Sequence, residues 1–245
     1  MCTVLTDSDY TTQEYLERVR HTCPPFLSSA DLAISCLVYL SLDGVRELPK
    51  NPFLKYAAQG WGEHSCGFDN CPNITKYAVG LLSDTAKVEM VGNVARPNGW
   101  PLLGASGLHL CSCFGLTHIA ERLPSYGQHI NLRDWRGRVP LHYAARFGQQ
   151  LMTKLLLETG KVDVDAGDKY EQTPLSWAAE NGHDRVVELL LETGKVDVNS
   201  RDRDHGRTPL SWAAENGHDG VVKLLLETGK VDVDSRDIRK TGNSF

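Results

Sequence analysis

The chain contains the same twelve residues twice. The segment TPLSWAAENGHD occupies residues 173–184 and recurs at residues 208–219, 35 positions further on. The likeness extends past these twelve, because residues 173–199 and 208–234 differ at only three of 27 positions. An enzyme seldom needs the same segment twice, whereas a unit that must pack against copies of itself does. The duplication therefore predicts a fold built by repetition.

Two weaker copies precede this pair. Residues 139–165 read VPLHYAARFGQQLMTKLLLETGKVDVD, and residues 106–131 read SGLHLCSCFGLTHIAERLPSYGQHIN. One leucine recurs at the same place in each copy, with spacings of 33, 34 and 35 residues: Leu108, Leu141, Leu175 and Leu210. A period in the low thirties is typical of a stacked solenoid.

The residues within one period predict a pair of helices. Pro174 suits the first turn of a helix, because its φ is fixed and its missing N–H costs nothing there, and Thr173 can cap that helix. Gly182 ends it, and Asp184 is placed to cap a second helix whose apolar stripe runs through residues 186–191. One such pair buries only part of its apolar surface, so the copies must stack.

These residues resemble ankyrin repeats, whose pattern is D-x-x-G-x-T-P-L-H-x-A-A-x-x-G-H followed by an apolar helix. The first clear copy matches the pattern at Asp134, Gly137, Pro140, Leu141, His142, Ala144, Ala145 and Gly148. The resemblance is strong from Leu132 to Asp234 and weak from Gly99 to Asn131. It implies an all-α ankyrin solenoid with clear repeats at 132–165, 166–199 and 200–234, a degenerate repeat at 99–131, and a truncated start of another at 235–245.

Two departures from the ankyrin pattern stand out. Ser176 and Ser211 occupy the position where the family usually has His, which removes a side chain that commonly bridges turn and helix. The turn from Asp202 to Arg207 carries one extra residue, and this accounts for the spacing of 35.

The upstream half predicts helices of another kind. Residues 31–40 read as a buried helix capped by Ser28 or Ser29, and residues 51–64 read as a second helix. Together these segments resemble the small winged-helix-like unit that follows the NACHT nucleotide-binding module in fungal STAND receptors, where ankyrin repeats often come next. We therefore expect a flexible N-terminus at 1–10 and an α-helical, winged-helix-like segment at 11–98. The resemblance implies that the chain is the rear part of such a receptor.

The sequence offers no support for catalysis or for a cofactor. The Gly-Lys pairs at residues 160, 194 and 229 are followed by Val instead of Ser or Thr, so we interpret them as helix ends and not as phosphate loops. Neither a G-x-S-x-G elbow nor an H-E-x-x-H helix is present. His183-Asp184 and His218-Asp219 look like parts of a catalytic triad, but their recurrence favours capping and loop packing. We predict a protein that is not an enzyme and carries no cofactor.

One cluster could be considered as a metal site. His64, Cys66 and Cys71 could supply three zinc ligands, whereas a structural site needs four and no second pair follows at a suitable spacing. A loop with free thiols is the preferred interpretation, and the role of these three residues stays open. Cys111 and Cys113 occupy positions where we expect small core residues.

Cysteine usage and charge bear on location and on the class of partner. All seven cysteines lie between Cys2 and Cys113, their number is odd, and the N-terminal residues are acidic and polar, unlike a secretory signal. Reduced thiols in a cytoplasmic or nuclear protein are the simplest interpretation. The net charge of −5 argues against specific nucleic-acid binding, and the apolar stretches are too short or too interrupted to span a membrane.

The best functional candidate is the surface formed by turn tips and first helices, which is concave in ankyrin-like stacks. Its turns carry Arg, Trp and Tyr, the residue types that dominate interface energetics. We expect Trp177 and Trp212 to stack between adjacent repeats. The predicted partner-binding residues are Trp135, Arg136, Arg138, Arg146, Phe147, Lys169, Tyr170, Gln172, Glu180, Asn181, Arg203, His205, Arg207, Glu215 and Asn216.

Two functions remain open at this point. The first is a non-catalytic scaffold or adaptor that binds a protein with an acidic, partly apolar patch on this concave surface. The alternative is the sensor and relay arm of an NTP-driven NACHT-type signalling receptor. Neither the partner nor the oligomeric state follows from the sequence. The last complete repeat lacks a polar capping version, so self-association through that repeat is a further expectation.

Overall fold

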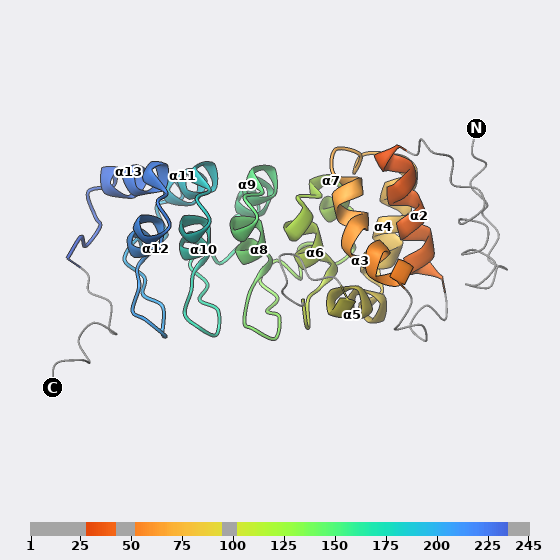
Figure 1. The fold of residues 1–245 in the computed structure, drawn as a ribbon, viewed down its shortest axis with the longest axis horizontal. Coiled ribbons are helices and arrows are strands. Elements are labelled where there is room, and N and C mark those ends of the chain that lie inside the picture. The colour runs from red at the N-terminus through yellow and green to blue at the C-terminus, as the bar shows by residue number, and fades with distance from the viewer. Residues whose placement is uncertain (1–27, 43–51, 95–101, 235–245) are drawn as a thin grey trace.

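The computed structural model describes residues 28–42, 52–94 and 102–234, and all regular secondary structure in these ranges is helical. The helices are α2 (Ser29–Ser41), α3 (Pro52–Ser65), α4 (Pro72–Ser83), α5 (Thr85–Val94), α6 (Gly107–Phe114), α7 (Thr117–Glu121), α8 (Pro140–Arg146), α9 (Gln150–Glu158), α10 (Pro174–Glu180), α11 (Asp184–Glu192), α12 (Pro209–Glu215) and α13 (Asp219–Glu227). Helices α2–α5 form a bundle at one end, and the remaining helices follow as a row of pairs (Figure 1). The predicted all-α stack is confirmed.

Each pair begins and ends as the repeat pattern predicts. Pro174 opens α10, and the Thr173 hydroxyl accepts a hydrogen bond from the Ser176 N–H at 3.3 Å. Gly182 follows this helix with φ of 70°, a conformation that glycine adopts without strain. One detail of the prediction was wrong. His183 is the N-cap of α11, and Asp184 lies in the first turn and makes no capping hydrogen bond, so its contribution there is a negative charge near the helix N-terminus.

The core lies between neighbouring pairs. The first helices α6, α8, α10 and α12 pack side by side, and the second helices α9, α11 and α13 form a parallel row above them (Figure 1). Leu175, Ala178 and Ala179 of α10 are fully buried. The alanines let α8 and α12 approach α10 closely, as their size predicts.

Two histidines connect the loop inside one helix pair to the preceding helix pair. The His183 Nε2–H donates to the Arg146 carbonyl at 2.9 Å, and the His218 Nε2–H donates to the Glu180 carbonyl at 3.0 Å. The ring of His218 lies against Gly182, where an added Cβ would come within 2.5 Å of His218 Nδ1. The prediction that these recurrent histidines serve loop packing is confirmed.

The N-terminal bundle is packed directly onto the first repeat. Trp61 of α3 is fully buried and meets Phe114 of α6 edge to face, with ring centroids 5.5 Å apart. The Cys66 thiol donates to the Phe114 carbonyl at 3.1 Å. The predicted helices at 31–40 and 51–64 are present as α2, capped by Ser28, and α3, which begins at Pro52.

Three expectations about the N-terminal half and the two chain ends stay predictions. Within 28–42 and 52–94 there is no strand that could form the wing of a winged helix, so that resemblance stays a prediction. The proposed flexible N-terminus at 1–10 and the truncated repeat at 235–245 lie outside the described residues. In the part of the chain that the structure covers, every helix is too short or too polar to cross a bilayer.

Candidate functional site: the turn tips and first helices

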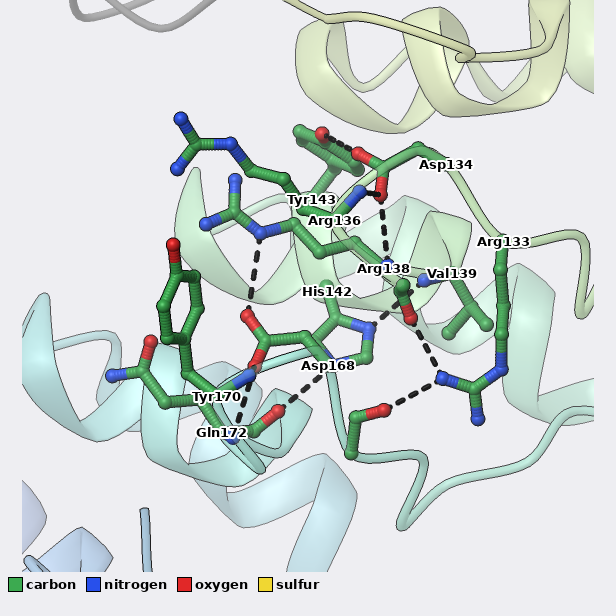
Figure 2. Close-up of polar contacts among 12 residues, drawn as sticks. Arg133, Asp134, Arg136, Arg138, Val139, His142, Tyr143, Asp168, Tyr170 and Gln172 are labelled. Atoms are coloured by element: carbon green, nitrogen blue, oxygen red, sulfur yellow. Dashed lines mark hydrogen bonds and ion pairs between the residues drawn. The ribbon is translucent and has the colours of Figure 1, made fainter. Parts of the chain in front are cut away.

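Three turns of common design precede the first helices α8, α10 and α12. In each turn an aspartate N–H donates to the carbonyl that closes the turn: Asp134 to Arg138 at 2.9 Å, Asp168 to Gln172 at 3.0 Å, and Asp202 to Arg207 at 3.0 Å. The carboxylate of the same aspartate accepts backbone N–H groups inside its turn, such as those of Tyr170 and Gln172 on Asp168 (Figure 2). The third turn contains the extra residue that the spacing of 35 predicted.

The turns are also joined to one another by backbone hydrogen bonds. Trp135 N–H donates to the Leu103 carbonyl at 3.2 Å, Lys169 N–H to the Arg136 carbonyl at 2.8 Å, and Arg203 N–H to the Tyr170 carbonyl at 2.8 Å. The turn tips therefore form one continuous ribbon that projects from the same side of the row of pairs (Figure 1). A ribbon tied in this way presents its side chains at fixed spacing.

Part of the predicted surface is exposed as expected. Trp135 is 62% exposed although its ring rests on Gly104, and Tyr170 is 39% exposed. Lys169 and Arg203 are exposed as well, and Arg136 is half-buried. Of the first-helix residues, Arg146, Phe147 and Glu180 are half-buried, whereas Asn181, Glu215 and Asn216 are exposed.

Arg138 was predicted to lie on the partner-binding surface, but its side chain lies in the interior between two repeats. Its side chain is buried, with the whole residue 3% exposed, and its Nε lies 3.4 Å from Asp168 Oδ2 (Figure 2). Its guanidinium lies 4.6 Å from the centroid of the Trp177 ring. Arg138 is thus a structural residue that joins the first turn to the second repeat, and its placement offers nothing to a partner.

Trp177 is the centre of a cationic stack. The Arg146 guanidinium also lies 4.6 Å from its ring centroid, so two arginines of the first clear repeat contact one tryptophan of the second. Trp177 is 4% exposed, which confirms that it stacks between repeats. Burial raises the pKa of the neighbouring Glu180 carboxyl, and the charges of Arg146, Arg138 and Arg207 oppose that rise.

The third turn pairs its charges differently. Arg203 donates to the Glu171 carboxylate at 2.7 Å across adjacent turn tips, and both side chains are exposed. Arg207 pairs with Glu215 of its own repeat at 2.6 Å and stacks on Trp212 at 4.5 Å from the ring centroid. His205 meets the same tryptophan at a centroid distance of 6.5 Å.

Residues outside the predicted partner-binding set also build this surface. His109 and His142 reach the next turn, where their Nε2–H groups donate to the carbonyls of Arg138 and Gln172 at 3.0 and 3.1 Å. Arg133 donates to the Gly137 and Gly167 carbonyls and so joins two turns (Figure 2). The histidines had a signal, because the ankyrin pattern contains a His at that position. The role of Arg133 had none.

The candidate metal cluster does not assemble. His64 Nε2 is 2.8 Å from the Tyr56 hydroxyl, and Cys66 hydrogen-bonds to the Phe114 carbonyl, while Cys71 precedes α4. Among the described residues, no three His, Cys, Asp or Glu side chains are grouped so as to hold a metal. Cys111 and Cys113 are buried core residues as predicted, and burial raises the pKa of both thiols.

The repeats are similar to short stretches of several plant proteins. A 70-residue stretch is 41% identical to the potassium channel KOR1 of Oryza sativa subsp. japonica and covers 28% of this chain. The ADP-ribosylation factor GTPase-activating protein AGD4 of Arabidopsis thaliana is 37% identical over 59 residues, 24% of this chain. The calmodulin-binding transcription activator CBT of Oryza sativa subsp. japonica is 36% identical over 73 residues, 30% of this chain.

In each case the matched stretch is 8% of the relative's own length. A channel, a GTPase-activating protein and a transcription activator differ in what their names describe, so what they share with this chain is a module and not an activity.

A family model supports the same conclusion over a longer stretch. The family described as "Ankyrin repeats (3 copies)" matches residues 108–202 and 161–237, which together span more than half of the 245 residues. The matched stretch begins in α6 and includes every helix pair described above. Tandem repeats of this kind are protein–protein interaction modules. The chain belongs to the ankyrin-repeat family.

Proposed function

We propose that the chain is a non-catalytic scaffold or adaptor, and that the ribbon of turn tips with the adjoining first helices binds a protein partner. The observation that carries this proposal is the exposure of two aromatic residues, Trp135 and Tyr170, on a ribbon whose backbone is fixed by hydrogen bonds. Rigid aromatic side chains lose little entropy on binding, and they are enriched among the residues that dominate interfaces.

Charge around these aromatics favours a partner with an acidic, partly apolar patch. Arg136 and Lys169 come from the first and second turns and flank the two rings in sequence. Lys169 is exposed, while Arg136 is half-buried. A carboxylate on the partner would gain from both charges without needing to be buried.

Site-specific photo-crosslinking tests the proposal directly. A photoreactive amino acid is placed at Trp135 or Tyr170, and for comparison at Leu151 of α9, which is 73% exposed and lies outside the ribbon. The crosslinked protein is then purified, and its affinity for the chain is measured by calorimetry. We expect crosslinks from the two ribbon positions and a loss of affinity of about tenfold or more in Trp135→Ala/Tyr170→Ala.

The matched control is Leu151→Ala, which removes a similarly exposed apolar side chain from α9. It should leave affinity unchanged, and both variants should keep the melting temperature of the parent chain, since none of the three side chains is buried. Crosslinks that arise only from α9, or equal losses of affinity in the two variants, would contradict the proposal.

The alternative assignment is the relay arm of a NACHT-type receptor. What supports it is the direct packing of the N-terminal bundle on the first repeat through Trp61 and Phe114, because such a joint would transmit a displacement of the repeats to the bundle. The gene sequence upstream of this segment tests the idea. An in-frame P-loop module would support it, and its absence would leave the adaptor function alone.

Location is a further part of the proposal. Cys36, Cys66, Cys71, Cys111 and Cys113 are free thiols, which is consistent with a reducing compartment, the cytoplasm or the nucleus. Microscopy of a fluorescent fusion tests this placement, and secretion of the fusion would contradict it.

A further inference from the structure

The three clear repeats meet at two junctions. On the side of the turn tips, the same positions of the repeat line each junction. In the first junction the positions hold Arg138, Arg146, Asp168, Trp177 and Glu180. In the second junction the equivalent positions hold Gln172, Glu180, Asp202, Trp212 and Glu215. In both junctions the aspartate N–H closes the turn, although the third turn is one residue longer than the second. At two of these positions the arginines are replaced by Gln172 and Glu180. The second junction also differs in this longer turn, and Arg207 lies on its tryptophan.

In the first junction the buried aspartate has its cation within the chain. The guanidinium of Arg138 lies between a carboxylate and an indole, 3.4 Å from Asp168 Oδ2 by its Nε and 4.6 Å from the Trp177 ring centroid. Arg146 adds a second cation on the same ring. Two guanidinium groups thus balance the charges of Asp168 and Glu180.

The second junction keeps the acid and the indole but lacks the arginine. Asp202 is 4% exposed, and its Oδ1 accepts the His205 N–H at 2.7 Å. Its Oδ2 is buried and has no hydrogen-bond partner among the described residues. An ionised oxygen in that state is costly, because burial removes water and nothing replaces it.

The surrounding charges do not compensate for the missing arginine. The charge of Glu180 is opposed by Arg146 and Arg138 of the first junction. Asp202 and Glu215 remain as two carboxylates of the second junction, against the single guanidinium of Arg207. Arg207 is already paired with Glu215 and stacked on Trp212. The junction therefore retains a negative balance beside an aromatic ring that is half-buried.

Resting on the function proposed above, we propose that the second junction is a receptor slot for an arginine side chain of the protein partner. The incoming guanidinium would occupy the place that Arg138 occupies one repeat earlier, donating to Asp202 Oδ2 and lying against Trp212. Guanidinium suits the slot because its planar fork donates to a carboxylate while its face stacks on an aromatic ring. Gln172, which is half-buried, stands at the sequence position equivalent to Arg138.

The slot and the turn tips predict different chemical groups on the partner. Trp135, Arg136 and Lys169 favour acidic and apolar groups, whereas the second junction, farther along the ribbon, selects a cation. A partner segment that fits both would carry its acidic residues toward the first turn and its arginine toward the third. Such an arrangement would also fix the direction in which the segment lies along the ribbon.

Blocked tripeptides test the slot on the full chain. Acetyl-Gly-Arg-Gly-amide is titrated into isotopically labelled protein, and indole N–H signals of the five tryptophans are followed by NMR. The same peptide with citrulline, which has the shape of arginine without its charge, and the peptide with lysine serve as matched probes. We expect the arginine peptide to shift the Trp212 signal and residues 202–207, and to bind at least about tenfold more tightly than either comparison peptide.

A variant that fills the slot from within provides the second measurement. Gln172→Arg should place a guanidinium beside Asp202 as Arg138 does beside Asp168, raise the melting temperature by about 2–4 °C, and reduce arginine-peptide binding at least tenfold. Gln172→Leu, of similar size but without donors, should do neither. Equal binding of the arginine and citrulline peptides would overturn the proposal, and so would equal binding of the lysine peptide.

Failure of the slot and failure of the adaptor function are distinguishable. If Gln172→Arg neither stabilises the chain nor weakens peptide binding, the slot is refuted. The binding of the crosslinked partner, measured with Trp135→Ala/Tyr170→Ala, would still decide on the interaction surface by itself.

Discussion

The second and third clear repeats are nearly identical in sequence and differ in burial. Leu175 and Trp177 are buried in the second repeat, whereas the equivalent Leu210 and Trp212 of the third are half-buried. The second repeat has a described helix pair on each side, and the third has one on the side of α10 and α11. Because the residues are the same, the difference comes from the neighbours. In this fold the stabilisation contributed by a residue is set by what lies beside its repeat.

The sharpest test of this comparison removes one arginine from each repeat junction. Arg138→Ala leaves the Asp168 carboxylate buried without its cation, and we expect a loss of about 4 kcal/mol in the free energy of unfolding. Arg207→Ala breaks a pair whose Glu215 is largely exposed, so the loss should be about 1 kcal/mol. Urea denaturation of both variants measures the difference. Equal losses would show that the two arginines have the same environment, against the burial seen here.

Removing the same leucine from both repeats tests packing alone. Leu175→Ala should cost about 3 kcal/mol, because it leaves a cavity between α8, α10 and α12. Leu210→Ala should cost about half as much, since Leu210 is only half-buried and its site can relax. The two variants share chemistry and sequence context, so urea midpoints compare them directly. A larger loss for Leu210→Ala would mean that something covers the third repeat in solution.

The sequence was sufficient to predict the helices and their order, but not the surroundings of individual side chains. Pro174, Gly182 and the leucine spacing predicted the helix pairs and their order, because those signals act locally. The burial of Arg138 could not be predicted, since it depends on Asp168 and Trp177 of another repeat and on the path that its side chain takes between them. The unpartnered oxygen of Asp202 could not be predicted either, because it depends on which side chains of other turns reach it.

A pH titration compares the first clear repeat with the two that follow. His142 is fully buried, its Nε2–H donates to the Gln172 carbonyl, and burial lowers its pKa to about 4, whereas the later repeats have Ser176 and Ser211 at this position. The unfolded chain takes up a proton near pH 6.5, and the folded chain does so only near pH 4. Stability therefore falls as the pH drops through this window, and His142 accounts for about 2 kcal/mol of the loss by pH 5.

The control for that titration is His142→Ser, which installs the residue of the later repeats. Its free energy of unfolding is expected to be lower than that of the parent chain at pH 7, through the loss of the hydrogen bonds to Val139 and Gln172. Between pH 7 and pH 5 it should change less than that of the parent chain. Parallel pH profiles for the two proteins would contradict the lowered pKa of His142.

The smallest effect concerns the turn tips. Glu171 has φ of 61°, in the left-handed region, at the position where the first and third turns have Gly137 and Gly206. A side chain is strained there by about 1 kcal/mol, and glycine relieves the strain at some cost in unfolded-state entropy. Glu171 also pairs with Arg203 of the next turn, and that exposed pair contributes about 0.5 kcal/mol. In Glu171→Gly the gain and the loss nearly cancel, so this variant is uninformative by itself.

Comparing Glu171→Gly with Glu171→Gln separates the two contributions. The glutamine variant keeps the strained backbone and removes the charge, so it should be about 0.5 kcal/mol less stable than the parent chain. The glycine variant should exceed the glutamine variant by about 0.5 kcal/mol, because only the backbone strain differs between them in the folded state. If thermal unfolding shows the glycine variant to be the less stable of the two, then the ribbon does not hold residue 171 in the left-handed conformation in solution. The pairing of Glu171 with Arg203 would then no longer explain why a glutamate stands at a left-handed position. The second turn would also have a backbone conformation that differs from that of the glycine-containing turns on either side of it.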